Sequence, residues 1–200
     1  MNLLAHALLS PADAPALLVG NLTADWIKGR VRHTLPADIQ AGFALHQRID
    51  AFTDTHPLIA DCIRRLADPW DRYAPVLVDI FLDHILTCQW PRHSATSRPA
   101  FIGATYATLR AHHHLLPPRA QYAIHALLAD DWFSCYASLD GIALSLSRLS
   151  NRLRHGVELA PAVRDFRRHQ DAFHEAFARF FPQLQRHVAV MPPLPVHCSA

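Results

Sequence analysis

The chain has 200 residues, 50% of them hydrophobic and 18% charged, which is the composition of a folded protein rather than a disordered one. Its length suits a single large domain, and its net charge of +2 excludes a global attraction to nucleic acid or another polyanion. No apolar run reaches ~18 residues and the N-terminus lacks a basic segment, so we expect neither a membrane span nor a signal peptide. The scattered cysteines, without metal-finger spacing, indicate reduced thiols and a cytoplasmic protein.

Apolar residues recur at i, i+3 and i+4 almost throughout, whereas alternating, strand-like segments are scarce. This pattern predicts an all-α, single-domain helical bundle. Breaks at Ser10-Pro11, Gly29 and His56-Pro57 separate the first helices. We predict a domain over residues 1–181, followed by a Pro-rich, loosely ordered tail over 182–200. The predicted helices cover about residues 2–9, 14–28, 37–55, 58–66, 71–90, 100–115, 118–135, 139–155 and 160–180.

Two of these helices carry polar residues at a spacing that is typical of metal ligands. In the helix over 37–55, His46, Asp50 and Asp54 follow one another at i, i+4 and therefore share a face. In the helix over 71–90, Asp79 and Asp83 are again four apart, and His84 adjoins them among large apolar residues. Buried carboxylates are costly unless they are paired, and Asp oxygens and His nitrogens suit Mn, Mg, Fe or Zn. We therefore predict a helical metal-dependent hydrolase; plain ion pairs on solvated helix faces are the alternative.

Two further residues are candidates for the same site, although each also has a non-functional interpretation. Asp25 lies between Leu22 and Trp26 on an otherwise apolar predicted helix, with Asn21 and Lys28 near it as phosphate contacts. Its alternative is an exposed aspartate. His6 interrupts the apolar run NLLAHALL, where the alternative is a hydrogen-bonded core histidine.

Other chemistries have less support. There is no GxSxG, Walker or GxGxxG motif, so serine hydrolase and nucleotide-cofactor chemistry are not indicated. A ferritin-like di-metal bundle needs Glu-x-x-His pairs, but the chain has only Glu158 and Glu175. A non-catalytic helical adaptor stays open, because residues 148–187 hold eight Arg against four acids and offer a basic docking face.

Four segments together resemble, in order and spacing, the acyl carrier protein phosphodiesterase family. They are NLLAH (2–6), GNLTADWIKG (20–29), HQRIDAFTD (46–54) and DIFLDHILTCQW (79–90). The resemblance implies an all-helical, Mn²⁺-dependent enzyme, distantly related to HD-domain phosphohydrolases, that removes 4′-phosphopantetheine from a serine of holo-acyl carrier protein. The adjacent His-Asp pair of the HD signature is reversed here, as Asp83-His84. Carried onto this chain, the resemblance gives the metal-site set His6, Asp25, His46, Asp50, Asp79, Asp83 and His84.

The charges of the residues near this set suggest roles in the reaction. A divalent metal ion would activate a water molecule and offset charge on the phosphoryl oxygens. We expect Lys28 and Arg48 to contact the phosphate, with Arg48 alternatively orienting an aspartate ligand, and Asp54 to protonate the departing serine oxygen. The partner would be the acidic carrier protein, with no nucleic acid or membrane partner; another HD-like phosphohydrolase activity is the alternative. The arginines expected to dock the carrier are Arg148, Arg152, Arg164, Arg167 and Arg168.

Overall fold

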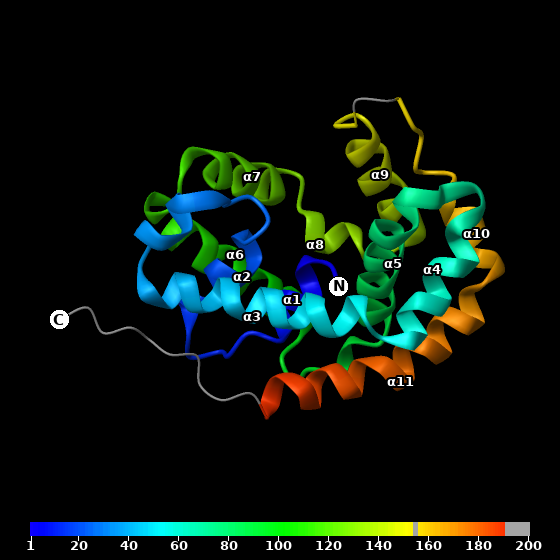
Figure 1. Ribbon diagram of the computed structural model, residues 1–200, viewed down its shortest axis with the longest axis horizontal. Helices are drawn as coiled ribbons and strands as arrows, with labels where there is room; N and C mark the ends of the chain where they lie inside the picture. Colours follow the sequence, from blue (N-terminus) through cyan, green and yellow to red (C-terminus); the bar gives the residue numbers. More distant parts are fainter. Residues whose placement is uncertain (154–155, 191–200) are drawn as a thin grey trace.

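The computed structural model describes residues 1–153 and 156–190, and within them it contains α-helices and short 3₁₀ turns but no strand (Figure 1). The all-α prediction is confirmed. The helices are α1 (Leu3–Leu8), α2 (Pro15–Thr23), α3 (Ala37–Asp54), α4 (Pro57–Trp70), α5 (Ala74–Cys88), α6 (Arg98–His112), α7 (Pro118–Ala129), α8 (Trp132–Cys135), α9 (Leu139–Ser150), α10 (Ala162–Arg168) and α11 (Gln170–Ala189). The 3₁₀ turns are Gly29–Thr34, Asp71–Tyr73, Trp90–Arg92 and His113–Leu115.

Proline defines the start of many of these helices. Pro15, Pro57 and Pro118 are the first residues of α2, α4 and α7. Proline is well tolerated there because the first-turn N–H groups have no intrahelical partner and its fixed φ already suits a helix. His56 adds a side-chain cap to α4, since its Nδ1 accepts the N–H of Leu58 at 3.3 Å.

The hydrophobic core is built around α5. Leu77, Phe81 and Ile85 on this helix are fully buried, as are Phe166 of α10 and Phe173 of α11. The rings of Phe81 and Phe166 stack with centroids 4.5 Å apart. Each buried side chain of this size stabilises the fold by ~1.5–3 kcal/mol. In Figure 1, α5 stands between α9 and α4, and α11 runs along the lower edge of the molecule.

The closest helix pairing joins α2 to α3, and it depends on two glycines. A Cβ atom on Gly20 would collide with the backbone carbonyl of Ile39, and one on Gly42 would collide with the carbonyl of Leu17. Because neither residue has a Cβ atom, the two backbones approach directly. This approach brings the end of α2, with Asn21, against the middle of α3, with His46.

Several predicted helices differ from the observed ones. The helix predicted to reach residue 28 ends at Thr23, so Asp25 lies in the following turn rather than on a helix. The segment predicted over 118–135 divides into α7 and α8 because Asp131 adopts left-handed backbone angles (φ 45°). The proposed domain boundary at residue 181 falls inside α11, which continues to Ala189 with Leu184 buried; residues 191–200 lie outside the described residues.

The remaining differences are smaller. The predicted helix over 160–180 divides at His169 into α10 and α11, and α5 begins at Ala74 after a 3₁₀ turn. The α4 helix reaches Trp70 with non-helical angles at Asp68, the residue before Pro69. Within the described ranges, no helix is both long and apolar enough to cross a membrane.

Candidate metal centre

Side chains from two helices converge on one point. His6 comes from α1, and His46 and Asp50 come from one face of α3. One ligand atom from each of the three side chains lies within 4.8 Å of the other two. Both histidines are buried and Asp50 is partly exposed, so the cluster opens to solvent on the carboxylate side.

The protonation pattern of His6 follows from its neighbours. The Asn21 side-chain amide donates to the His6 carbonyl and to Ser10 Oγ, at 2.9 Å each, which fixes the orientation of that amide. Asn21 Oδ1 must then accept from His6 Nδ1, 2.8 Å away. With its proton on Nδ1, a neutral His6 ring turns the lone pair of Nε2 towards Asp50 Oδ1 at 3.1 Å. Two lone pairs facing each other require a proton or a cation between them.

His46 is held in the same way by the backbone. Its Nδ1 donates to the carbonyl of Asn21 at 2.8 Å, so this nitrogen is protonated and Nε2 faces the cluster. Nε2 lies 2.9 Å from Asp50 Oδ2 and 3.7 Å from Asp25 Oδ2. It is nevertheless not aligned for a hydrogen bond with either, and it has no hydrogen-bond partner among the described residues. After loss of its proton, such a nitrogen is a suitable metal ligand.

The surroundings of the cluster shift the pKa values of the two histidines in opposite directions. Burial opposes charge on His46, but the carboxylates of Asp25 and Asp50 outweigh it and raise the pKa of His46 to about 9. Burial lowers the pKa of His6, despite the neighbouring Asp50. Burial would raise the pKa of Asp50, but contacts with His46 and His6 hold it well below its usual range. Asp50 is therefore ionised at neutral pH and lies opposite one neutral and one protonated ring.

This donor set fits a divalent metal ion. Metal-binding histidines usually donate the other ring N–H to a carbonyl or carboxylate oxygen, which sets the tautomer and the ring orientation. Asn21 accepts this hydrogen bond from both rings, through its side-chain oxygen from His6 and through its backbone oxygen from His46. Two Nε2 atoms and one carboxylate suit Mn, Fe or Zn.

Comparison with known proteins places the chain among its relatives. The family model described as acyl carrier protein phosphodiesterase matches residues 1–184. The chain belongs to the acyl carrier protein phosphodiesterase family. A phosphodiesterase of this name from Photorhabdus laumondii is 33% identical over 185 residues, which is 92% of this chain and 93% of the relative. The proteins of the same name from Yersinia enterocolitica and Yersinia pestis are 32% and 30% identical and cover 92% and 93% of this chain, or 95% and 96% of their own length. No solved structure matches the chain significantly.

The other carboxylates of the set that the family resemblance implied lie around this cluster rather than in it. Asp25 is 67% exposed, and its ion-pair neighbours among the described residues are His46 and Lys28. Asp83 on α5 is fully buried, and its two oxygens accept the N–H groups of Leu4 and Ala5 at 2.8 and 3.2 Å. It thereby binds the N-terminal turn of α1. Asp79, one turn earlier on α5, lies 3.0 Å from the amino group of Met1.

His84 points in a different direction from Asp83. Its Nδ1 donates to the carbonyl of Tyr136 at 2.8 Å, and its ring lies edge-on to Phe166, with centroids 5.9 Å apart. Burial lowers its pKa, so His84 is neutral in this setting. Adjacent residues on a helix project about 100° apart, which separates His84 from the face that Asp83 presents to α1. Within the described chain, His84 does not join His6, His46 and Asp50.

The residues expected to act on the phosphate and the leaving group lie at different distances from the cluster. Asp54 follows Asp50 by one turn on α3 and is exposed; burial, with the negative charges of Asp50 and Asp79, raises its pKa. Lys28 is 70% exposed, with Nζ 4.0 Å from Asp25 Oδ1. Arg48 is two residues from both His46 and Asp50, so it projects from another side of α3.

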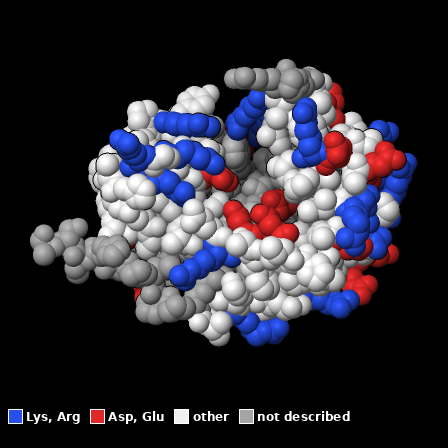
Figure 2. All heavy atoms as spheres, viewed as in Figure 1, with Lys and Arg blue, Asp and Glu red and all other residues white. Residues whose placement is uncertain are grey.

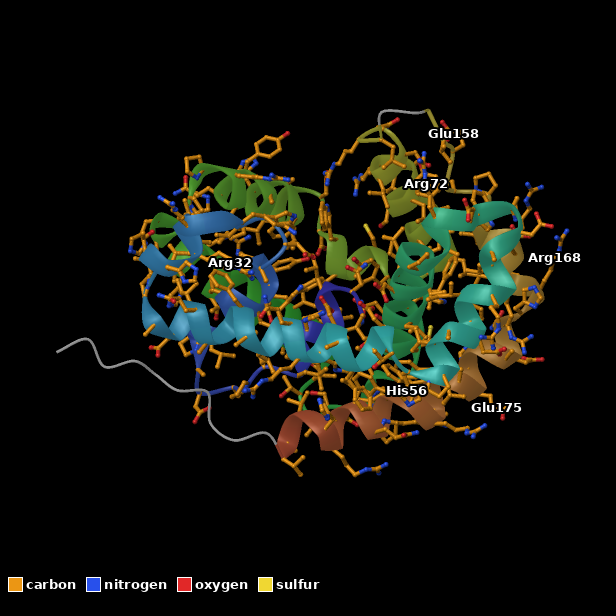
Figure 3. All side chains as sticks on the ribbon, viewed as in Figure 1. Arg32, His56, Arg72, Glu158, Arg168 and Glu175 are labelled. Carbon is orange, nitrogen blue, oxygen red and sulfur yellow. The ribbon has the colours of Figure 1, made fainter. Side chains whose placement is uncertain are left out.

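Figure 2 shows acidic side chains gathered in a hollow near the centre of one face, with Lys and Arg side chains around it. Arg148 and Arg152 of the predicted docking set lie at α9 and just beyond it, where Arg148 pairs with Asp130 at 3.4 Å. Arg168 lies at the far edge on α10 (Figure 3), paired with Asp165 at 3.0 Å. The docking face for a partner stays a prediction.

The role of Asn21 was not predicted from the sequence. Asn21 was expected to contact the phosphate, whereas its side chain and backbone hold both histidines. A signal was available: Asn21 is a polar residue in the apolar run LLVGNL, adjacent to a glycine. A buried amide in such a run needs several hydrogen-bond partners, which the cluster supplies.

Proposed function

We propose that this member of the family hydrolyses the phosphodiester that joins 4′-phosphopantetheine to the serine of holo-acyl carrier protein, using a divalent metal ion. The observation that carries the proposal is the convergence of His6, His46 and Asp50, with both ring Nδ1–H groups engaged by Asn21. The names of the relatives supply the reaction. Mn²⁺ is the ion that we propose, and the cytoplasm is the proposed compartment.

A divalent ion held by His6, His46 and Asp50 would supply an activated water molecule and neutralise negative charge on the phosphoryl oxygens. The contribution of the chain is to hold its donors in place before the substrate arrives. His6 and His46 cannot rotate without breaking hydrogen bonds of 2.8 Å to Asn21. Asp25 extends the donor set on the exposed side, where a substrate has access.

The serine oxygen that leaves must gain a proton, and Asp54 is placed to give it. Asp54 lies one helical turn from Asp50 on the same face of α3. Partial burial raises its pKa, as do the charges of Asp50 and Asp79, against the lowering effect of the Met1 amino group. Such a carboxyl group is a suitable general acid.

Lys28 supplies the positive charge for the phosphate in this proposal. Its flexible, exposed side chain already approaches Asp25, and from there its ammonium group can reach a phosphoryl oxygen beside the cluster. Because Arg48 projects from another side of α3, its proposed role is to orient an aspartate ligand rather than to contact the phosphate. Asp79 and Asp83 support the start of the chain and α1, which carries His6, whereas His84 holds the carbonyl of Tyr136 at the end of α8.

Incubation of purified holo-acyl carrier protein with the enzyme and Mn²⁺ tests this function. Mobility on a conformation-sensitive gel distinguishes holo- from apo-carrier, and mass spectrometry identifies released 4′-phosphopantetheine. Asp50→Asn should lose the activity, whereas Asp38→Asn, an exposed aspartate on the same helix, should keep it. Release of phosphate from other diesters without any action on holo-carrier would favour a different phosphohydrolase. No turnover and no metal binding would favour the adaptor alternative.

A further inference from the structure

A cavity of about 150 Å³ lies between α5, α8, α9 and the start of α1. Its walls are mostly apolar and include Val76, Trp132 and Leu149, and Tyr136 and Asn2 form its inner end. Val76 is 37% exposed, which is unusual for an aliphatic residue on the core helix α5. Neither the metal cluster nor the family comparison accounts for this cavity.

The cavity is adjacent to the metal cluster through α1. Asn2 caps α1, its backbone oxygen accepts the N–H of His6 at 3.3 Å, and its side chain donates to Tyr136 Oη at 3.0 Å. The inner end of the cavity is therefore about one helical turn, ~5.4 Å of rise, from His6. On α5, Val76 likewise precedes Asp79 by about one turn.

The cavity also carries polar groups that can bind a neutral polar chain. The guanidinium group of Arg152 lies 5.0 Å from the centroid of the Trp132 ring, and it has no carboxylate partner among the described residues. Ser145 donates its hydroxyl hydrogen to the carbonyl of Gly141 at 3.0 Å, which leaves its oxygen free to accept. The cavity thus combines apolar walls with hydrogen-bonding groups.

We propose that this cavity binds the pantoyl end of the phosphopantetheine arm while its phosphate lies at the metal cluster. This inference rests on the proposed function. In the arm, the carbon that follows the phosphate-bearing CH₂ carries two methyl groups, and a hydroxyl and an amide come next. The methyl groups match Val76, Trp132 and Leu149, and the hydroxyl and amide carbonyl match Ser145 and Arg152. At about 150 Å³ the cavity is smaller than pockets that enclose whole drug-sized ligands, so it holds the pantoyl unit and not the whole arm.

A direct binding measurement tests the inference without relying on turnover. Leu149→Trp fills the cavity from α9, and Val76→Trp fills it from the exposed side of α5. Leu144→Trp is the matched control, because Leu144 lies on the same helix as Leu149 but is 48% exposed and outside the cavity. Calorimetry with Mn²⁺ present would measure the affinities of 4′-phosphopantetheine, pantetheine and inorganic phosphate, and circular dichroism would check folding.

We expect Leu149→Trp and Val76→Trp each to weaken the binding of 4′-phosphopantetheine and of pantetheine at least tenfold. The affinity for inorganic phosphate should not change in these variants, and the Leu144→Trp control should bind all three ligands as the wild type does. Unchanged 4′-phosphopantetheine affinity in the folded Val76→Trp variant would overturn the inference. The inference would also be overturned if Leu144→Trp weakened 4′-phosphopantetheine binding equally, or if the cavity variants weakened the binding of inorganic phosphate equally. If the wild-type chain binds 4′-phosphopantetheine through the cavity but leaves holo-carrier intact, the proposed reaction fails while the cavity assignment stands.

Discussion

The imidazole rings of His6 and His46 are stacked, with centroids 4.3 Å apart, and both direct Nε2 to the same carboxylate. Charge on both rings at this separation would be repulsive, which agrees with a lowered pKa for His6 and a raised pKa for His46. A divalent ion held between the two rings would bind both Nε2 atoms, once His46 has lost its proton.

Removal of metal should abolish activity without unfolding the protein. The helices that carry the ligands pack on an extensive apolar core, so chelator-treated enzyme should keep its helical circular dichroism and regain turnover with Mn²⁺. Metal analysis of Asp50→Asn and of the control Asp38→Asn would check that binding depends on the cluster. Turnover that persists in excess chelator would remove the metal from the reaction, and global unfolding on metal loss would make its role structural.

Asn21→Ala should weaken Mn²⁺ binding by ~10–100-fold, because the His6 ring loses the acceptor that sets its tautomer. The free energy of unfolding should fall by ~1–3 kcal/mol, because the buried His6 Nδ1–H is left unpaired. Calorimetric titration with Mn²⁺ and urea unfolding measure the two effects. Gln40→Ala is the matched control: this amide also donates to a backbone carbonyl, that of Leu35 at 2.7 Å, but it is away from the cluster. Equal effects from both variants would deny Asn21 a positioning role.

Asp54→Asn should lower kcat on holo-carrier by ~100-fold while KM and Mn²⁺ affinity stay close to wild type. The amide cannot supply a proton to the departing serine oxygen. A 4-nitrophenyl phosphodiester has a leaving group that needs no proton, so its hydrolysis, where measurable, should change little. A comparable loss on both substrates would mean that Asp54 acts through the metal ligands or the fold instead.

Asp83→Asn should change how stability depends on pH. Burial raises the pKa of Asp83 to about 7, against the lowering effect of the N–H groups of Leu4 and Ala5, whereas the unfolded value is 3.8. Because the folded protein holds this proton more tightly, the contribution of Asp83 to stability is greatest below pH 4 and is lost as the pH rises to about 7. The variant lacks this group, so its free energy of unfolding, relative to wild type, should rise between pH 4 and 7. Parallel pH profiles from urea unfolding would contradict the raised pKa.

The sequence predicted the helical architecture and the face of α3 because both depend on local spacing. His46 and Asp50 are one turn apart, and that relation survives whatever the helix packs against. His6 was a candidate only because it interrupts an apolar run and because the family resemblance includes it. Its contact with Asp50 could not be predicted from local spacing, since that contact depends on the packing of α1 on its neighbours. Asp83 and His84 are adjacent in sequence yet face α1 and Tyr136 respectively, a difference that depends on which elements surround α5. Asp25 lies in a turn because α2 ends at Thr23.

The contact between Gly20 and Gly42 determines which substitutions a genetic screen would recover. His46 is held by the backbone oxygen of Asn21, so no side chain at position 21 can abolish that bond by itself. A single methyl group on either glycine, in contrast, must separate α2 from α3 and carry that oxygen away from the ring. Selection for loss of function should therefore return alanine and serine at positions 20 and 42, although neither residue belongs to the metal cluster. Two residues that have no side chain thereby control the position of His46 relative to its backbone partner.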